Sequence, residues 1–123
     1  MKKKIFNKIE LYADGADEKD ILNFNKMKII KGLTPNPSLM KKSGIKNYEI
    51  FCKKIIKKVK KPISFEIFAD DEKNMIRQAR IINKWGKNIY VKIPVVNTKN
   101  KIMTRVISKL SKEVTVIVTT YFC

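Results

Sequence analysis

The sequence predicts an α/β protein built on a parallel β-sheet, and two observations support this fold class. Apolar segments rich in β-branched residues recur roughly every 20–28 residues, as expected of strands. Amphipathic segments that begin with helix-capping residues lie between them. This alternation is typical of right-handed crossovers that join parallel strands. It fits an open doubly wound sheet and the first five strands of a barrel equally well.

The first two β/α units lie in the N-terminal third of the chain. A strand over 9–13 leads through a turn to a helix over 18–26, for which Asp17 is the expected N-cap. A second strand over 28–33 ends in a Thr-Pro-Asn-Pro-Ser loop at 34–38. The two prolines exclude helix through this loop and fix the position of its asparagine.

The remaining elements follow in the same alternation. We expect a short helical turn over 38–43 and a helix that Asn47 caps and that runs to about Lys60, with a stripe of apolar residues that includes Tyr48. After Pro62, the expected elements are a strand over 63–68, a helix that begins at Asp70 and Asp71 and ends at Gly86, a strand over 88–96, a helix over 100–112 and a strand over 114–120.

Length and composition fit one domain without a membrane span or a metal. The chain has 123 residues, of which 44% are hydrophobic, so we expect a single domain over residues 1–123. No apolar run approaches the ~18 residues of a membrane span, and no signal peptide is evident, so we expect a cytoplasmic protein with no membrane partner. Histidine is absent and Cys52 and Cys123 lack metal-ligand spacing, which predicts no metal site.

The net charge of +17 raises the alternative of a nucleic-acid partner. Only three of the 28 basic residues are arginine, whereas surfaces that grip phosphate and read bases usually depend on arginine. The lysine enrichment therefore predicts no specific nucleic-acid partner. Loose, salt-sensitive binding of polyanions stays open as an alternative.

Lys92 lies in the middle of the apolar strand over 88–96. Burial of a charged lysine is costly unless the lysine is paired with an opposite charge or loses its proton. The neutral amine is the form that attacks a carbonyl to make a Schiff base. Pro94 should mark the strand's end, which places Lys92 near the carboxyl edge where parallel α/β folds carry their chemistry. The alternative is a lysine whose charged end simply reaches solvent.

Polar residues of chemical type lie at the carboxyl end of every predicted strand: Asp14, Thr34 with Asn36, Glu66, Lys92 and Thr119. Together they supply a lysine amine, two carboxylates and hydroxyl groups, the set that Schiff-base chemistry requires. The alternative is that Glu66 and Lys92 form only a structural ion pair.

Four segments carry a resemblance to a known family: Ala13–Asp17, Thr34–Met40, Ser64–Asp70 and Tyr90–Val95. At these segments, and at Thr119, the chain resembles the transaldolase family, which includes transaldolases and fructose-6-phosphate aldolases, and it looks most like a small bacterial branch. Residues 34–40 look like the family's Thr-Thr-Asn-Pro-Ser/Thr-Leu signature. The segment around Lys92 looks like the family's Schiff-base strand.

The resemblance implies an (α/β)₈ barrel, of which this chain holds about the first five β/α units, and transfer of a dihydroxyacetone unit between sugar phosphates without a cofactor. By position, Lys92 would be the nucleophile and Asp14 the proton-transferring acid/base. Glu66 and Thr119 would hold the catalytic water, and Asn36 with Thr34 would orient the substrate. Transaldolases carry Glu at the position of Glu66.

Three features depart from the family pattern. Pro35 replaces a threonine, and Ile117 stands where transaldolases commonly carry a substrate-contacting asparagine. The chain ends after the fifth strand, before the family's phosphate-binding strands, so we expect a C-terminally truncated, partial barrel. Such a barrel should aggregate, self-associate through its open sheet edges, or need the missing half supplied elsewhere. The alternative function is a non-catalytic remnant or interaction module of the same fold.

Overall fold

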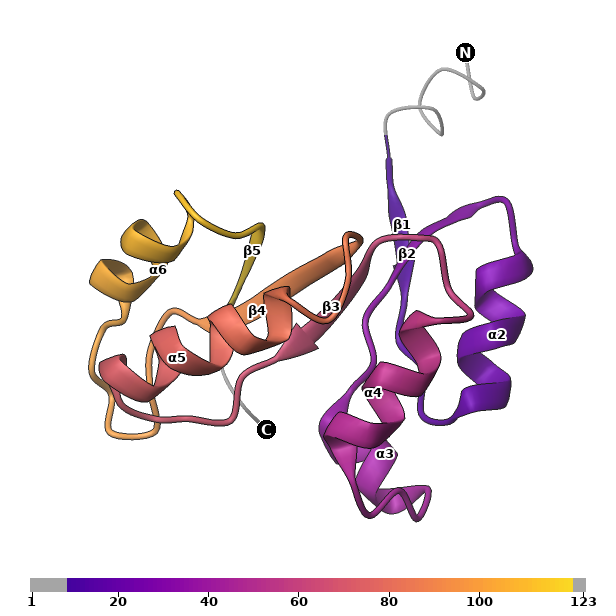
Figure 1. Ribbon diagram of the computed structural model, residues 1–123, viewed down its shortest axis with the longest axis horizontal. Coiled ribbons are helices and arrows are strands. Elements are labelled where there is room, and N and C mark those ends of the chain that lie inside the picture. Colours follow the sequence, from indigo (N-terminus) through magenta and orange to yellow (C-terminus); the bar gives the residue numbers. More distant parts are fainter. Residues whose placement is uncertain (1–8, 121–123) are drawn as a thin grey trace.

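The computed structural model describes residues 9–120, in which five parallel strands form one curved sheet (Figure 1). The strands pair in the order in which they occur in the chain: β1 (Leu11–Ala13), β2 (Ile30–Leu33), β3 (Ile63–Glu66), β4 (Ile89–Pro94) and β5 (Val116–Thr119). When each right-handed crossover adds its strand at the same edge, all connecting helices lie on one face of the sheet. This arrangement is a partial (β/α) barrel, which confirms the predicted fold class.

Five helices connect the strands: α2 (Glu18–Lys26), α3 (Pro37–Lys42), α4 (Tyr48–Ile56), α5 (Glu72–Asn83) and α6 (Thr104–Leu110). The predicted caps of two of them are confirmed, because Asp17 accepts from the Asp20 N–H at the start of α2 and Asn47 accepts from the Ile50 N–H at the start of α4. Asp71 caps α5 in the same way. Side-chain caps of this kind satisfy backbone donors that lack a partner inside the helix.

Two predicted helices are longer than the observed ones. α4 ends at Ile56 rather than near Lys60, and α6 covers 104–110 rather than 100–112. Before α6, the Asn97 side chain accepts hydrogen bonds from the backbone N–H groups of Lys99 and Lys101, which folds this segment into a turn instead of a helix. The prediction missed that asparagine can offer the backbone this alternative.

The buried core lies between the helices and one face of the sheet. α2 packs on β2 and α5 packs on β4. Phe65 of β3 is fully buried, and its ring meets the rings of Tyr48 and Trp85 in edge-to-face contacts with centroids 6.2 and 5.9 Å apart. Cys52 of α4 is buried as a free thiol, and burial raises its pKa to about 12, so it is inert. Cys123 lies outside the described residues.

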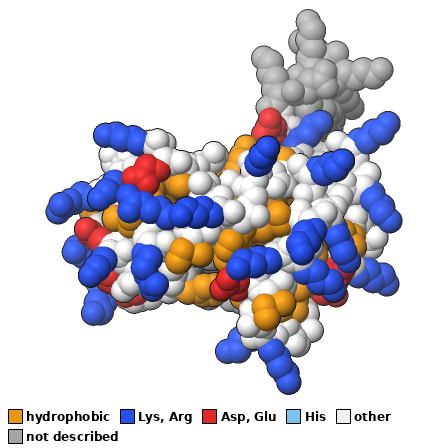
Figure 2. All heavy atoms as spheres, viewed as in Figure 1, with side chains coloured by type: hydrophobic (Ala, Val, Ile, Leu, Met, Phe, Trp, Pro, Cys, Tyr) orange, Lys and Arg blue, Asp and Glu red, His pale blue; other side chains and the backbone are white. Residues whose placement is uncertain are grey.

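The other face of the sheet carries the polar strand residues. Side chains alternate between the faces along a strand, so Glu66 and Lys92 lie opposite the buried positions Phe65 and Val91. Figure 2 shows lysine and arginine side chains spread over the visible surface rather than gathered in one patch. Among the described residues, no helix is long and apolar enough to cross a membrane.

Candidate active site

Strand register places three of the predicted site residues on neighbouring strands. Glu66 pairs with Lys92 across β3 and β4, and Pro94 pairs with Thr119 across β4 and β5. Lys92 and Thr119 therefore belong to adjacent rows of the same face, at the carboxyl ends of the strands. Pro94 is the last residue of β4, as predicted. Ile117 is the direct register partner of Lys92 on β5.

The Lys92 charge acts on Glu66 without forming a close ion pair with it. Loss of hydration raises the pKa of the half-buried Glu66 carboxyl group, and the positive charge of Lys92 opposes that rise. Within residues 9–120, no nitrogen–oxygen distance of 4.0 Å or less joins the two side chains. A structural ion pair, which the sequence left open as the alternative, is thus not what the geometry shows.

Asp14 and Thr34 form a second group at the ends of β1 and β2. The Thr34 hydroxyl donates a hydrogen bond to the Asp14 carboxylate, and the Thr34 N–H donates to the Ala13 carbonyl over 2.9 Å. These contacts fix both side chains at the same carboxyl edge of the sheet that carries Lys92. The structure thereby gives the Asp14 carboxylate a defined donor.

Asn36 has a structural task that limits how it could contact a substrate. Its Oδ1 caps α3 by accepting from the backbone N–H groups of Ser38 and Leu39, over 2.9 and 3.2 Å. A contact from Asn36 to a substrate would therefore use its amide nitrogen. The prolines at 35 and 37 hold this geometry, in agreement with the stiff loop expected from the sequence.

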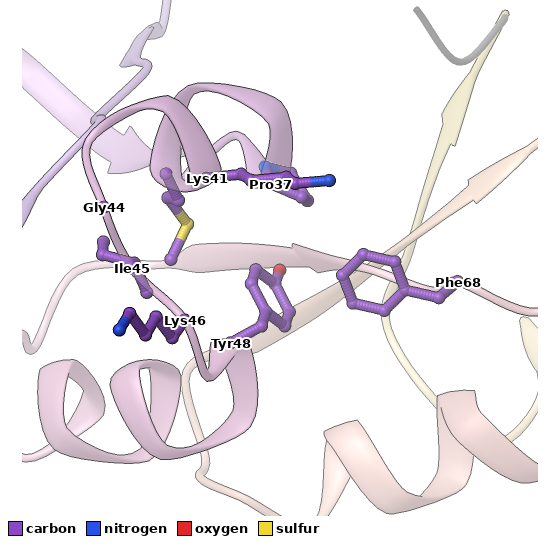
Figure 3. A pocket seen from close by; sticks show the side chains of 8 residues that line it. Pro37, Lys41, Gly44, Ile45, Lys46, Tyr48 and Phe68 are labelled. Carbon is purple, nitrogen blue, oxygen red and sulfur yellow. The ribbon is translucent and has the colours of Figure 1, made fainter.

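A cavity of about 510 Å³ lies beside this edge of the sheet (Figure 3). Its lining is mainly apolar and aromatic, and it comprises Pro37, Met40, Lys41, Gly44, Ile45, Lys46, Tyr48 and Phe68. None of the residues predicted for the site lines it. Its link to them is Tyr48, whose hydroxyl accepts a hydrogen bond from the Glu66 N–H over 3.3 Å.

Sequence reasoning missed two residues near the site. Tyr48 was expected only as part of an apolar helix stripe, and its ring is indeed packed there, but its hydroxyl faces β3. The Ser64 hydroxyl is buried without a hydrogen-bond partner among the described residues, two positions before Glu66 and on the same face. Alternation along the predicted strand could have placed Ser64 with Glu66, whereas no local signal marks the tyrosine.

The described residues contain no cluster of three or more His, Cys, Asp or Glu side chains that could hold a metal ion. The groups available for chemistry are therefore the Lys92 amine, the Asp14 and Glu66 carboxylates, and the hydroxyl groups of Thr34 and Thr119. An amine can form an adduct with a carbonyl compound, and a neighbouring carboxyl group with a raised pKa can exchange protons with that adduct.

The fold and this polar edge define a partial (β/α) barrel with polar side chains at the carboxyl ends of its strands, the edge at which such barrels carry their active sites. A model of the transaldolase/fructose-6-phosphate aldolase family matches residues 11–123. The chain therefore belongs to the transaldolase family, as its motifs suggested.

Relatives named "Probable transaldolase" support this assignment. The chain is 36% identical over 105 residues to the one from Methanococcus vannielii, which covers 85% of this chain and 46% of that protein. It is 37% identical over 106 residues to the one from Dehalococcoides mccartyi, covering 85% and 47%. With the one from a Thermoanaerobacter species, it shares 40% identity over 87 residues, covering 71% and 40%. The chain thus spans about half the length of the curated relatives that it matches.

Proposed function

We propose that this protein carries out transaldolase-type chemistry, in which Lys92 forms a Schiff base with a ketose sugar phosphate and a dihydroxyacetone unit is transferred. The observation that carries the proposal is the pairing of Lys92 with Glu66 on the helix-free face of a transaldolase-family sheet. The raised pKa of Glu66 supports it, because a carboxyl group that binds its proton more tightly can exchange that proton with the water released at Lys92.

Each site residue then has a role. The Lys92 amine attacks the ketone carbon, and loss of water from the resulting carbinolamine gives the iminium. Asp14 takes the proton of the C4 hydroxyl as the C3–C4 bond breaks, which releases an aldehyde sugar phosphate and leaves the dihydroxyacetone unit on Lys92 for addition to an acceptor aldehyde. The Thr34 hydroxyl is the hydrogen-bond donor to Asp14. Glu66 and Thr119 hold the water that leaves and returns, while Asn36 and Thr34 orient the sugar. Lysine chemistry of this kind requires no cofactor.

The second candidate is a non-catalytic interaction module of the same fold. Ile117 favours it, because this apolar side chain is the register partner of Lys92 where the family commonly carries a substrate-contacting asparagine. An apolar neighbour provides no hydrogen bond to a substrate hydroxyl, so binding at this position would be weaker.

Reductive trapping separates the two candidates. The full chain is incubated with fructose 6-phosphate and borohydride, which reduces a Schiff base to a stable amine, and the intact mass is measured. We expect one dihydroxyacetone adduct on the parent chain, because cleavage of the C3–C4 bond releases glyceraldehyde 3-phosphate, and none on Lys92→Ala. Lys31→Ala is the matched control, since Lys31 is an exposed lysine of β2, and it should form the adduct as the parent does.

Absence of an adduct from the folded parent chain would reject the enzymatic proposal in favour of the interaction module. An adduct that persists in Lys92→Ala would reject Lys92 as the nucleophile. Circular dichroism of all three proteins establishes that they are folded.

A further inference from the structure

β2 and β3 separate before they reach the carboxyl edge of the sheet. Their register contains one pair, Leu33 with Ile63, whereas β3 and β4 stay paired as far as Glu66 and Lys92. The side of β3 that faces β2 therefore lacks a strand partner beyond its first residues. A backbone N–H that faces this gap needs a hydrogen-bond acceptor from elsewhere.

Glu66 exposes its N–H to that gap. The N–H groups of Ile63 and Ile67 point to β4, where they donate to the carbonyls of Asn88 and Lys92 over 3.0 and 3.3 Å. Because successive N–H groups of a strand alternate in direction, the Glu66 N–H points to the β2 side. On that side, the Tyr48 hydroxyl accepts a hydrogen bond from the Glu66 N–H over 3.3 Å.

Packing contacts and a helix cap hold Tyr48 in this position. Asn47, the residue immediately before Tyr48, caps α4. The Tyr48 ring meets the Phe68 ring edge-on with centroids 4.8 Å apart, in addition to its contact with the Phe65 ring. Figure 3 shows the Tyr48 and Phe68 rings next to each other along the cavity. Burial raises the pKa of Tyr48, so its hydroxyl stays protonated and neutral.

We propose that Tyr48 is a positioning residue, whose hydroxyl takes the place of the missing β2 acceptor and holds the end of β3 so that the Glu66 carboxyl group stays half-buried beside Lys92. The role of Glu66 in catalysis rests on the proposed function, but its placement by Tyr48 does not. Without the hydroxyl, the end of β3 frays, water reaches the carboxyl group, and its proton affinity drops.

The test is a carbon-detected NMR titration of the Glu66 carboxyl group in the full chain. In Tyr48→Phe we expect its titration midpoint to fall toward that of a free glutamate. Tyr12→Phe is the matched control, because it removes a tyrosine hydroxyl that contacts Glu10 instead, and it should leave the midpoint unchanged. An unchanged midpoint in Tyr48→Phe would overturn the proposal.

A second variant keeps the test decisive if Tyr48→Phe does not fold. Phe68→Leu removes the ring that orients Tyr48 but no hydrogen bond, and Phe68 is 58% exposed, so little core packing is lost. We expect a smaller fall of the Glu66 midpoint in the same direction, and no fall would count against the role of Tyr48. The titration needs no substrate, so it decides about Tyr48 even if the parent chain forms no adduct with fructose 6-phosphate.

Discussion

Glu66 lies in surroundings that penalise its ionised form. Its carboxyl group is half-buried at the end of β3, where loss of hydration raises its pKa despite the nearby Lys92 charge. At a pH between the pKa of an unfolded glutamate and the raised value, the native chain keeps a proton that the unfolded chain has released. Folding takes up a proton at this residue, so stability depends on pH with a definite sign.

We expect the free energy of unfolding of the parent chain to fall, relative to Glu66→Gln, as the pH rises through that interval. The charged form of Glu66 disfavours the native state, whereas glutamine is neutral at every pH. Urea unfolding of both proteins at a series of pH values measures the difference. A difference that stays constant, or grows in favour of the parent, would contradict the assigned environment of Glu66.

Glu113→Gln provides a control of opposite sign. Hydrogen bonds from the Arg80 guanidinium lower the pKa of Glu113, so its contribution is present above the pKa of an unfolded glutamate. As the pH falls through the lowered pKa of Glu113, the parent chain should lose stability relative to this variant. The two substitutions are chemically identical, and only the surroundings differ.

Among the elements, α4 is the one on which both the core and Tyr48 depend. Its inward face buries Cys52 and Ile55, while its surface ion pair between Glu49 and Lys53 is exposed and contributes little. The start of the helix depends on Asn47, whose Oδ1 accepts from the Ile50 N–H over 3.0 Å. The cap therefore fixes both the helix and the tyrosine that follows it.

Asn47→Ala should destabilise the chain by about 1 kcal/mol, because the first turn of α4 loses its acceptor. The matched control is Asn23→Ala, an exposed position within α2 where alanine is the better helix former, so no loss is expected. Thermal or urea unfolding gives both values. Equal effects of the two substitutions would show that the cap adds nothing to stability.

At the scale of the whole molecule, the sheet has two edges. Within residues 9–120, β1 and β5 each pair on one side, and apolar residues near both edges are accessible, with Leu11 39% and Val118 52% exposed. Unpaired strand edges with apolar side chains favour pairing with other chains. The net charge of +17 opposes this by repulsion between copies, which salt screens.

We therefore predict self-association that increases with protein and salt concentration, measured by sedimentation velocity. The double variant Leu11→Lys and Val118→Lys should stay monomeric, because it adds charge to both edges. Ile50→Lys is the control: Ile50 is 67% exposed on α4, away from the edges, so this variant should associate as the parent does. Equal association of all three proteins would locate the contact elsewhere.

Sedimentation velocity in the presence of DNA tests the alternative that the lysine-rich surface binds polyanions. Binding of nucleic acid through lysines would weaken steeply as salt increases, the reverse of association through apolar edges. Negligible affinity for DNA at physiological salt would remove this interpretation.

Much of this architecture could be predicted from local patterns. The apolar run around Lys92, its end at Pro94 and the caps at Asp17 and Asn47 depend on neighbouring residues, so the sequence reveals them directly. The position of the polar residues at one edge of the sheet follows from the parallel order of the strands, because parallel strands end at the same edge. Their chemical roles depend on a substrate and stay predictions.

The features that the sequence could not reveal depend on contacts between distant segments. The bond from the Glu66 N–H to Tyr48 joins residues 18 positions apart, and the separation of β2 from β3 depends on the pairing of Leu33 with Ile63. No periodic pattern records either feature. The start of α6 was misplaced because the Asn97 side chain binds the backbone ahead of it, a competition that helix propensity does not describe.

The strand order β1-β2-β3-β4-β5 also bears on how this protein folds. Because every strand pairs with the next strand along the chain, each pairing closes one short loop, and the contact order is low for a parallel sheet. The sheet can grow by one β/α unit at a time, starting from the N-terminus. A chain emerging from the ribosome can thus add each strand to the preceding edge as soon as its helix has left the exit tunnel, without waiting for the C-terminus.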